Sequence, residues 1–199
     1  MASPGAACAA MIAAMTSRVV LGVDFGSTTA KAILAGEDGE LIGQASVPQA
    51  VDRGPGGTAE QDPERWWSDL QTLVRRTLGE ASAAPPARDI RLAGLAISGH
   101  LPTLALVDAD GRLLGPAMLY ADRRADALIQ QARELSGQRL GGDELLPKLL
   151  WLAANDPARL VAAHRLHNLY DFLVHRLTGA RALDHRTAMR SALFDPVAM

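Results

Sequence analysis

The sequence is poor in cysteine, in net charge and in long apolar runs. Cys8 is the one cysteine among 199 residues, which excludes an internal disulfide framework and a zinc site built from cysteines. A formal net charge of −2 gives no electrostatic reason to expect nucleic acid or an anionic membrane as a partner. No apolar run approaches the length needed to cross a bilayer. These absences indicate a globular protein of a reducing compartment, and we expect a cytoplasmic location.

The first 17 residues lack the features of a targeting signal. Residues 6–15 are apolar, but no lysine or arginine precedes Arg18, so the positively charged segment of a secretory signal peptide is missing. We expect residues 1–17 to form a disordered extension, with Met11 or Met15 as an alternative start. The histidines show no His-x-x-x-His spacing, which argues against a zinc site.

Residues 18–31 carry the clearest chemical signal. The apolar run Val19–Val23 predicts a strand buried on both faces, with Asp24 at its end. Gly26 allows a sharp turn that brings backbone amides close to an anion. A second strand is expected over Ala30–Ala35, so the acidic turn lies on a β-hairpin.

The polar residues of this turn suit a nucleotide phosphate site. The hydroxyls of Ser27, Thr28 and Thr29 can donate to phosphate oxygens, and Lys31 can add positive charge. Asp24 repels phosphate unless a divalent cation lies between them, so the pattern predicts Mg²⁺ with a nucleotide. It is not a Walker loop, which needs Gly-Lys-Ser/Thr entering a helix. The same composition is also typical of an ordinary turn, and both interpretations stay open here.

The remaining chain alternates strand and helix patterns, which indicates an α/β class with a mixed sheet. Asp62 and Pro63 predict a helix start, and Trp66 falls at helical spacing with the apolar residues as far as Leu78, whereas the role of Trp67 is open. Strands are expected over 41–47, 91–98, 104–107 and 113–119, helices over 122–135, 147–154, 157–164 and 169–177, a loop over 51–59, and an Ala/Pro linker over 81–87.

Seven segments, taken together and in order, resemble the FGGY carbohydrate kinases, and within them the xylulokinase-like sugar kinases. This resemblance implies an actin/hexokinase/Hsp70-like (ribonuclease H-like) fold with a mixed central sheet and flanking helices. Residues 18–199 would form the N-terminal domain of such a kinase. The segments are Gly22–Lys31, Glu60–Trp67, Gly94–Gly99, Leu106–Ala117, Tyr120–Arg124, Pro147–Trp151 and Tyr170–Leu173.

The resemblance implies transfer of the ATP γ-phosphoryl group to a hydroxyl of a pentulose such as xylulose, or of a related sugar or polyol. ATP and Mg²⁺ would be the cofactors, and a homodimer is left open. The phosphate and Mg²⁺ residues would be Asp24, Gly26, Ser27, Thr28, Thr29 and Lys31. The sugar-side residues would be His100, Leu101, Pro102, Asp122 and Arg124.

Three departures limit what the resemblance implies. His100 stands where relatives usually carry Gln, and Pro102 replaces their sugar-contacting His, so the substrate is open. The segment before Pro147 is shorter than in relatives, where a loop at this position supplies another sugar contact. The sequence also ends at Met199, before the Gly-Gly-Asp-Asn stretch that carries the family's catalytic base, so we expect the isolated chain to be inactive. A non-catalytic module that binds sugar or phosphate, and an actin-like ATPase, are the alternatives.

Several of these residues also have purely structural interpretations. Asp122 and Arg124 suit an ion pair at a helix start as well as a sugar contact. His100 suits a turn histidine. Lys148 and Arg159 are expected to be solvated charges on helix faces, and Asp184 is expected to be structural.

Overall fold

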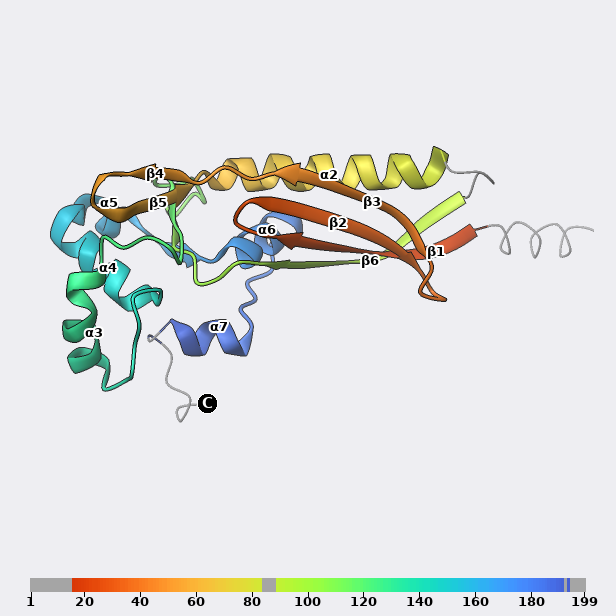
Figure 1. Cartoon of the computed structure of the whole chain (residues 1–199). Helices are drawn as coiled ribbons and strands as arrows, with labels where there is room; N and C mark the ends of the chain where they lie inside the picture. Colours follow the sequence, from red (N-terminus) through yellow and green to blue (C-terminus); the bar gives the residue numbers. More distant parts are fainter. Residues whose placement is uncertain (1–15, 84–88, 192, 194–199) are drawn as a thin grey trace, which may run out of the picture. The chain divides into compact units, whose positions relative to one another are not determined.

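The computed structural model describes residues 16–83, 89–191 and 193, and the chain divides into two compact units (Figure 1). Unit 1 comprises Met1–Gln49 and Ser68–Ser98, and unit 2 comprises Ala50–Trp67 and Gly99–Met199. The expected disordered extension lies outside the described residues, apart from Thr16 and Ser17. These two residues begin the first strand, so the expectation of disorder is wrong for them.

Unit 1 is built on a four-stranded mixed sheet with the order β3-β2-β1-β6. Three consecutive antiparallel strands form most of it, as the expected strands over 19–23, 30–35 and 41–47 and the Asp38-Gly39 hairpin turn predict. The strands are β1 (Thr16–Phe25), β2 (Thr29–Gly36), β3 (Leu41–Pro48) and β6 (Asp89–Gly99).

Only one face of strand β1 is buried. Val19, Leu21 and Val23 are at most 3% exposed, whereas Val20, between two of them, is 52% exposed. The expectation of burial on both faces is therefore wrong for this strand. Its strict alternation is that of a strand with one packed and one open face. Asp24 lies on the open face, in phase with Val20.

The helix α2 (Pro63–Ala83) runs along the sheet of unit 1 (Figure 1). The backbone of β3 approaches it closely, because a Cβ on Gly43 would lie 2.8 Å from the carbonyl oxygen of Thr77. The amide of Gln44 also donates to Glu80 Oε2 over 2.9 Å. The face of the sheet that packs on α2 is therefore buried. The site described below lies on the opposite face.

The start of α2 follows its sequence signal. Asp62 Oδ1 accepts from the Glu64 amide over 2.9 Å, and Pro63 is the first helical residue. Trp66 is fully buried, as predicted. The helix reaches Ala83 rather than Leu78, so the expected linker is wrong for residues 81–83; residues 84–87 lie outside the described part. No described helix combines the length and apolarity that a bilayer crossing requires.

Unit 2 contains two small sheets. The first has the order β4-β5-β8, from β4 (Asp52–Gly54), β5 (Thr58–Gln61) and β8 (Ala117–Met118). The expected loop over 51–59 is wrong, because β4, a short 3₁₀ turn η1 (Pro55–Gly57) and β5 form a hairpin there. The expected strand 113–119 is reduced to β8. The second sheet pairs β7 (Ala105–Val107) with β9 (Arg165–His167).

Short helices complete unit 2 around a core of Leu104, Leu106, Met118, Leu145 and Leu152. The expected helix over 122–135 is wrong in its first part, where residues 122–125 lie outside any helix and the α-helix begins only at Ile129. The Asp122 carboxylate is drawn inward there to the Ala59 amide, 3.0 Å away. The helices are η2 (Asp126–Leu128), α3 (Ile129–Ser136), α4 (Leu145–Asn155), α5 (Pro157–Ala162), α6 (Leu169–Thr178) and α7 (His185–Arg190).

Candidate functional site

The turn between β1 and β2 brings the predicted phosphate residues onto one short hairpin of unit 1. The Gly26 amide donates to the Thr29 carbonyl over 3.1 Å and closes the turn. A Cβ on Gly26 would lie 2.8 Å from that same carbonyl oxygen, so only glycine fits without a shift. The Thr28 carbonyl in turn accepts from the Gln49 amide over 2.8 Å, which ties the turn to the end of β3.

Asp24 and Lys31 lie directly opposite each other in the β1–β2 register. Opposite residues of an antiparallel pair lie on the same face of a sheet, and both of these side chains are exposed. They line one hollow of about 350 Å³ on the open face, together with small and apolar residues of β1, β2 and β6. Gly26, Ser27, Thr28 and Thr29 form the adjoining turn rather than the wall of this hollow.

The donor set of this turn fits a cation that arrives with a nucleotide. Among the described residues, no group of three or more His, Cys, Asp or Glu side chains is placed to hold a metal ion by itself. Mg²⁺, however, commonly binds through one or two carboxylates, phosphate oxygens and water. Asp24 offers one such carboxylate, and Lys31 adds a positive charge beside it.

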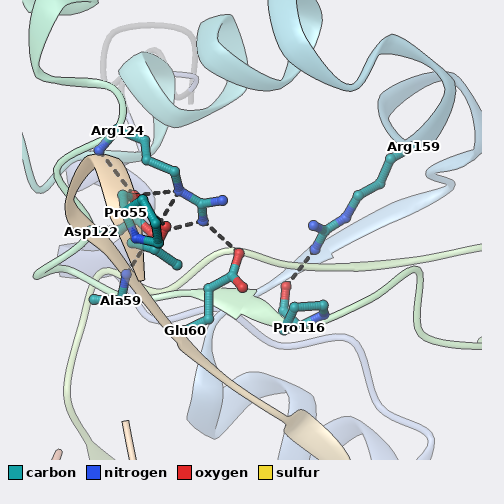
Figure 2. Close-up of polar contacts among 8 residues, drawn as sticks. Pro55, Ala59, Glu60, Pro116, Asp122, Arg124 and Arg159 are labelled. Atoms are coloured by element: carbon teal, nitrogen blue, oxygen red, sulfur yellow. Dashed lines mark hydrogen bonds and ion pairs between the residues drawn. The ribbon is translucent and has the colours of Figure 1, made fainter. Parts of the chain in front are cut away.

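In unit 2, Asp122, Arg124 and Glu60 form a hydrogen-bonded network (Figure 2). Asp122 is fully buried and accepts from the Ala59 amide, the Arg124 amide and the Arg124 guanidinium. Arg124 Nη2 also donates to Glu60 over 2.5 Å, and the guanidinium lies 4.5 Å from the Trp151 ring centroid. Burial would lower the pKa of Arg124, but its hydrogen bonds to Asp122 and Glu60 raise it overall. This geometry favours the ion-pair interpretation over a direct sugar contact.

His100 lies in a second polar cluster of unit 2, which we call the His100 cluster: Gln61, Trp66, His100 and Tyr120. Gln61 Oε1 accepts from Trp66 Nε1 over 2.9 Å and lies 3.1 Å from His100 Nε2. Because an amide oxygen can only accept, Nε2 of His100 carries a proton. The Tyr120 ring lies 6.0 Å from the His100 ring, and Tyr120 is 37% exposed.

The other two predicted sugar-side residues contribute less surface. Pro102 is buried and Leu101 is half-buried beside His100. The sequence interpretation named neither Gln61 nor Tyr120 as a site residue. Gln61 gave no signal of its own, whereas Tyr120 was visible as the aromatic residue that opens the Tyr120–Arg124 segment.

Lys148 and Arg159 are not the solvated charges that the sequence suggested. Lys148 is fully buried, and its Nζ donates to the Asp143 carbonyl over 2.6 Å. Burial lowers the pKa of Lys148 to about 8, although Asp122 and Asp143 oppose this shift. Arg159 is half-buried and donates to the Pro116 carbonyl over 2.5 Å (Figure 2), and burial lowers its pKa. The apolar neighbours of Lys148 in the sequence were the signal that could have indicated its burial.

Comparison with known proteins gives one consistent result. Residues 19–198 match the N-terminal domain of the FGGY family of carbohydrate kinases. The xylulose kinase of Escherichia coli K12 is 29% identical over an alignment of 182 residues, and the match covers 88% of this chain and 36% of that protein. The L-fuculokinase of Salmonella typhi is 31% identical over an alignment of 195 residues, and the match covers 91% of this chain and 39% of that protein.

The solved structures agree with these relatives. The xylulose kinase of Rhodospirillum rubrum has a TM-score of 0.81 at 26% identity, covering 91% of this chain and 38% of that one. The fold is therefore of the actin/hexokinase-like type, as expected. The chain spans somewhat more than a third of the length of the relatives it matches.

Proposed function

Because this chain belongs to the FGGY family of carbohydrate kinases and matches its N-terminal domain, we propose that it supplies the phosphate-turn half of an ATP-dependent sugar kinase. The pairing of Asp24 with Lys31 beside the Gly26 turn carries this proposal. An exposed carboxylate opposite an exposed ammonium suits a Mg²⁺–phosphate ligand, which presents both positive and negative charge.

The proposed work of the turn is positioning and charge neutralisation. When bound, Mg²⁺–ATP would supply the phosphoryl group that is transferred. Asp24 would hold the cation side of this ligand, Lys31 would face phosphate oxygens, and the hydroxyls of Ser27, Thr28 and Thr29 would donate to them. Phosphoryl transfer depends on such positioning more than on covalent chemistry by the protein.

For the acceptor we propose the His100 cluster as the sugar-side surface of unit 2. The partly exposed Tyr120 ring offers an apolar face for sugar C–H groups, and the His100 ring, held by Gln61, lies beside it. Asp122 and Arg124 would act by bracing this part of the chain through Glu60. His100, Leu101 and Pro102 would shape the specificity.

A pentulose such as xylulose is the proposed acceptor class, with other sugars and polyols as the alternatives. Xylulose kinases are prominent among the relatives and the solved structures, but a glycerol kinase and an L-fuculokinase show similar identity. A panel of ketoses, aldoses and polyols, assayed by ADP release with protein made from the whole reading frame, tests this proposal. Turnover with glycerol alone would contradict the pentulose assignment.

We also propose that residues 1–199 by themselves transfer no phosphoryl group, since the kinases to which this chain is similar are more than twice its length. The same ADP-release assay on the purified 199-residue chain tests this point. Activity that the Asp24→Ala substitution abolishes would show that the chain contains a complete site.

A further inference from the structure

A pocket at the junction of β9 and α6 in unit 2 gathers positive charge away from the phosphate turn and from the His100 cluster. It has a volume of about 270 Å³. Arg165, His167, Asp171, His175 and Arg181 line it, and we call it the Arg165–Arg181 pocket. Asp171 lies in the Tyr170–Leu173 segment of the family resemblance, but the proposed kinase function uses none of the pocket residues.

Local geometry explains why these side chains meet. Arg165 and His167 are two residues apart on β9, so they lie on the same face of that strand. Asp171 and His175 are four residues apart on α6, so they lie on the same face of that helix. Arg181 follows just after Gly179, the residue that ends α6.

The hydrogen bonds fix the state of one histidine. Arg165 Nη1 lies 3.3 Å from His175 Nε2, and a guanidinium can only donate. His175 Nδ1 lies 3.0 Å from the Ala180 carbonyl, to which it must donate. His175 is therefore neutral in this arrangement, and it holds the Arg165 guanidinium at the pocket wall.

The second histidine offers a nitrogen to the pocket. His167 is 6% exposed, and its Nδ1 lies 2.8 Å from Asp171 Oδ2. Asp171 Oδ1 accepts a hydrogen bond from the backbone amide of Asn168 over 2.6 Å. Among the described residues, Nε2 of His167 makes no hydrogen bond, so this buried ring presents an unused polar atom to the pocket that it lines.

The charges select the class of ligand. Arg181 lines the pocket without an ion-pair partner among the described residues, and Arg165 has only the neutral His175 in contact. Asp171 is already engaged by His167 and Asn168. Two guanidinium groups exclude a metal cation, and no group of three metal-ligating side chains occurs in the described part of the chain. The planar guanidinium group donates two parallel hydrogen bonds, and this geometry is typical of phosphate recognition.

We propose that the Arg165–Arg181 pocket binds a small tetrahedral oxyanion, either inorganic phosphate or the phosphate group of a small phosphomonoester. Arg165 and Arg181 would donate to its oxygens, and His167 Nε2 would donate to a third, with Asp171 as the counter-ion of the ring. Three such donors around one phosphate would give binding that depends on each arginine. The inference does not rest on the kinase activity, because no residue of the pocket belongs to the proposed phosphate turn.

The test titrates the 199-residue chain with sodium phosphate at constant ionic strength, and follows heat and the histidine ring signals in NMR spectra. We expect saturable binding with shifts at His167 and His175. Arg181→Gln should weaken it roughly tenfold, the usual cost of losing one charge-assisted hydrogen bond. Arg139→Gln is the matched control, because Arg139 is exposed and lies outside the pocket, and it should change the affinity less than about twofold.

Two further arms complete the experiment. Titration with methyl phosphate distinguishes the two candidate ligands. Binding tighter than that of inorganic phosphate indicates a phosphomonoester as the ligand, and weaker binding indicates inorganic phosphate. The Arg165→Gln variant repeats the test at the other wall, with circular dichroism to confirm folding. The proposal is overturned if phosphate acts no differently from chloride, or if Arg181→Gln and Arg139→Gln weaken binding equally.

Discussion

Asp24 on β1 lies directly opposite Lys31 on β2, and both side chains are exposed on the open face of the unit 1 sheet. The two side chains are cross-strand neighbours, and neither is buried. Exposed pairs of this kind contribute little to the free energy of unfolding, so both groups are available to a ligand.

The first prediction concerns the stability contribution of this pair. We expect Asp24→Asn to change the free energy of unfolding by less than about 1 kcal/mol, the upper range for exposed cross-strand pairs. Urea denaturation followed by circular dichroism measures this change. A loss of several kcal/mol would instead make Asp24 a structural residue.

The second prediction concerns the Gly26 turn. A Cβ there would meet the Thr29 carbonyl oxygen at 2.8 Å, so Gly26→Ala should destabilise the chain by about 1–3 kcal/mol. Gly79→Ala is the matched control, because a Cβ on that glycine of α2 meets nothing within 4 Å. The control should stabilise by about 0.5–1 kcal/mol. Thermal unfolding of both variants compares them, and equal shifts of the two midpoints would contradict the close approach.

The third prediction separates the two interpretations of Asp122. This carboxylate is fully buried against Arg124 and the Ala59 amide. Asp122→Asn should therefore destabilise by about 1–3 kcal/mol, since it removes one of the two carboxylates that bind Arg124 and leaves Glu60 as the other. Asp126→Asn, which removes a half-exposed carboxylate 3.7 Å from Arg123, should cost about 0–1 kcal/mol. If Asp122→Asn leaves the stability unchanged and raises only the KM for sugar, the direct sugar contact is correct.

The fourth prediction uses the pH dependence of Lys148. Burial lowers its pKa in the folded chain to about 8, from the ordinary value near 10.5. Between these values the unfolded chain binds more protons, so the contribution of Lys148 to stability rises with pH. The gain amounts to at most about 3 kcal/mol between pH 8 and 10.5.

A comparison of wild type with Lys148→Met isolates this effect. The free energy of unfolding of the wild type, minus that of the variant, should increase as the pH rises from 8 to 10. Denaturation curves at four or five pH values give this difference. Parallel curves would show that Lys148 keeps its ordinary pKa in the folded chain.

Sequence patterns predicted the elements that are long or that have sharp boundaries. The β1–β2–β3 meander followed from three short strand-like segments and from the Asp38-Gly39 turn. Helix α2 followed from Asp62-Pro63 and from the helical spacing of Trp66 with the apolar residues after it. Strands β4 and β9 were missed because each has three residues that are mostly polar or glycine, whereas the equally short β7 is wholly apolar. The sequence around Asp122 suggested a helix, but a tertiary hydrogen bond to Ala59 holds a turn there instead.

The site was predictable only where neighbours in sequence are neighbours in space. Asp24, Gly26 and Lys31 belong to one hairpin, so their proximity followed from the strand pattern. The contacts of His100 with Gln61 and Tyr120, and the burial of Lys148, depend on segments far apart in the chain. No local pattern encodes the contacts of His100. For Lys148, the prediction of a surface position rested on charge alone and did not use its apolar neighbours in the sequence.

The most direct test of the central assignment is ADP release by protein made from the whole reading frame, with xylulose as acceptor and with Asp24→Asn beside the wild type. We predict turnover by the wild type, and a loss of at least about a hundredfold in kcat in the variant with its stability retained. Xylulose phosphorylation that is unaffected by Asp24→Asn would contradict the phosphate role of the β1–β2 turn.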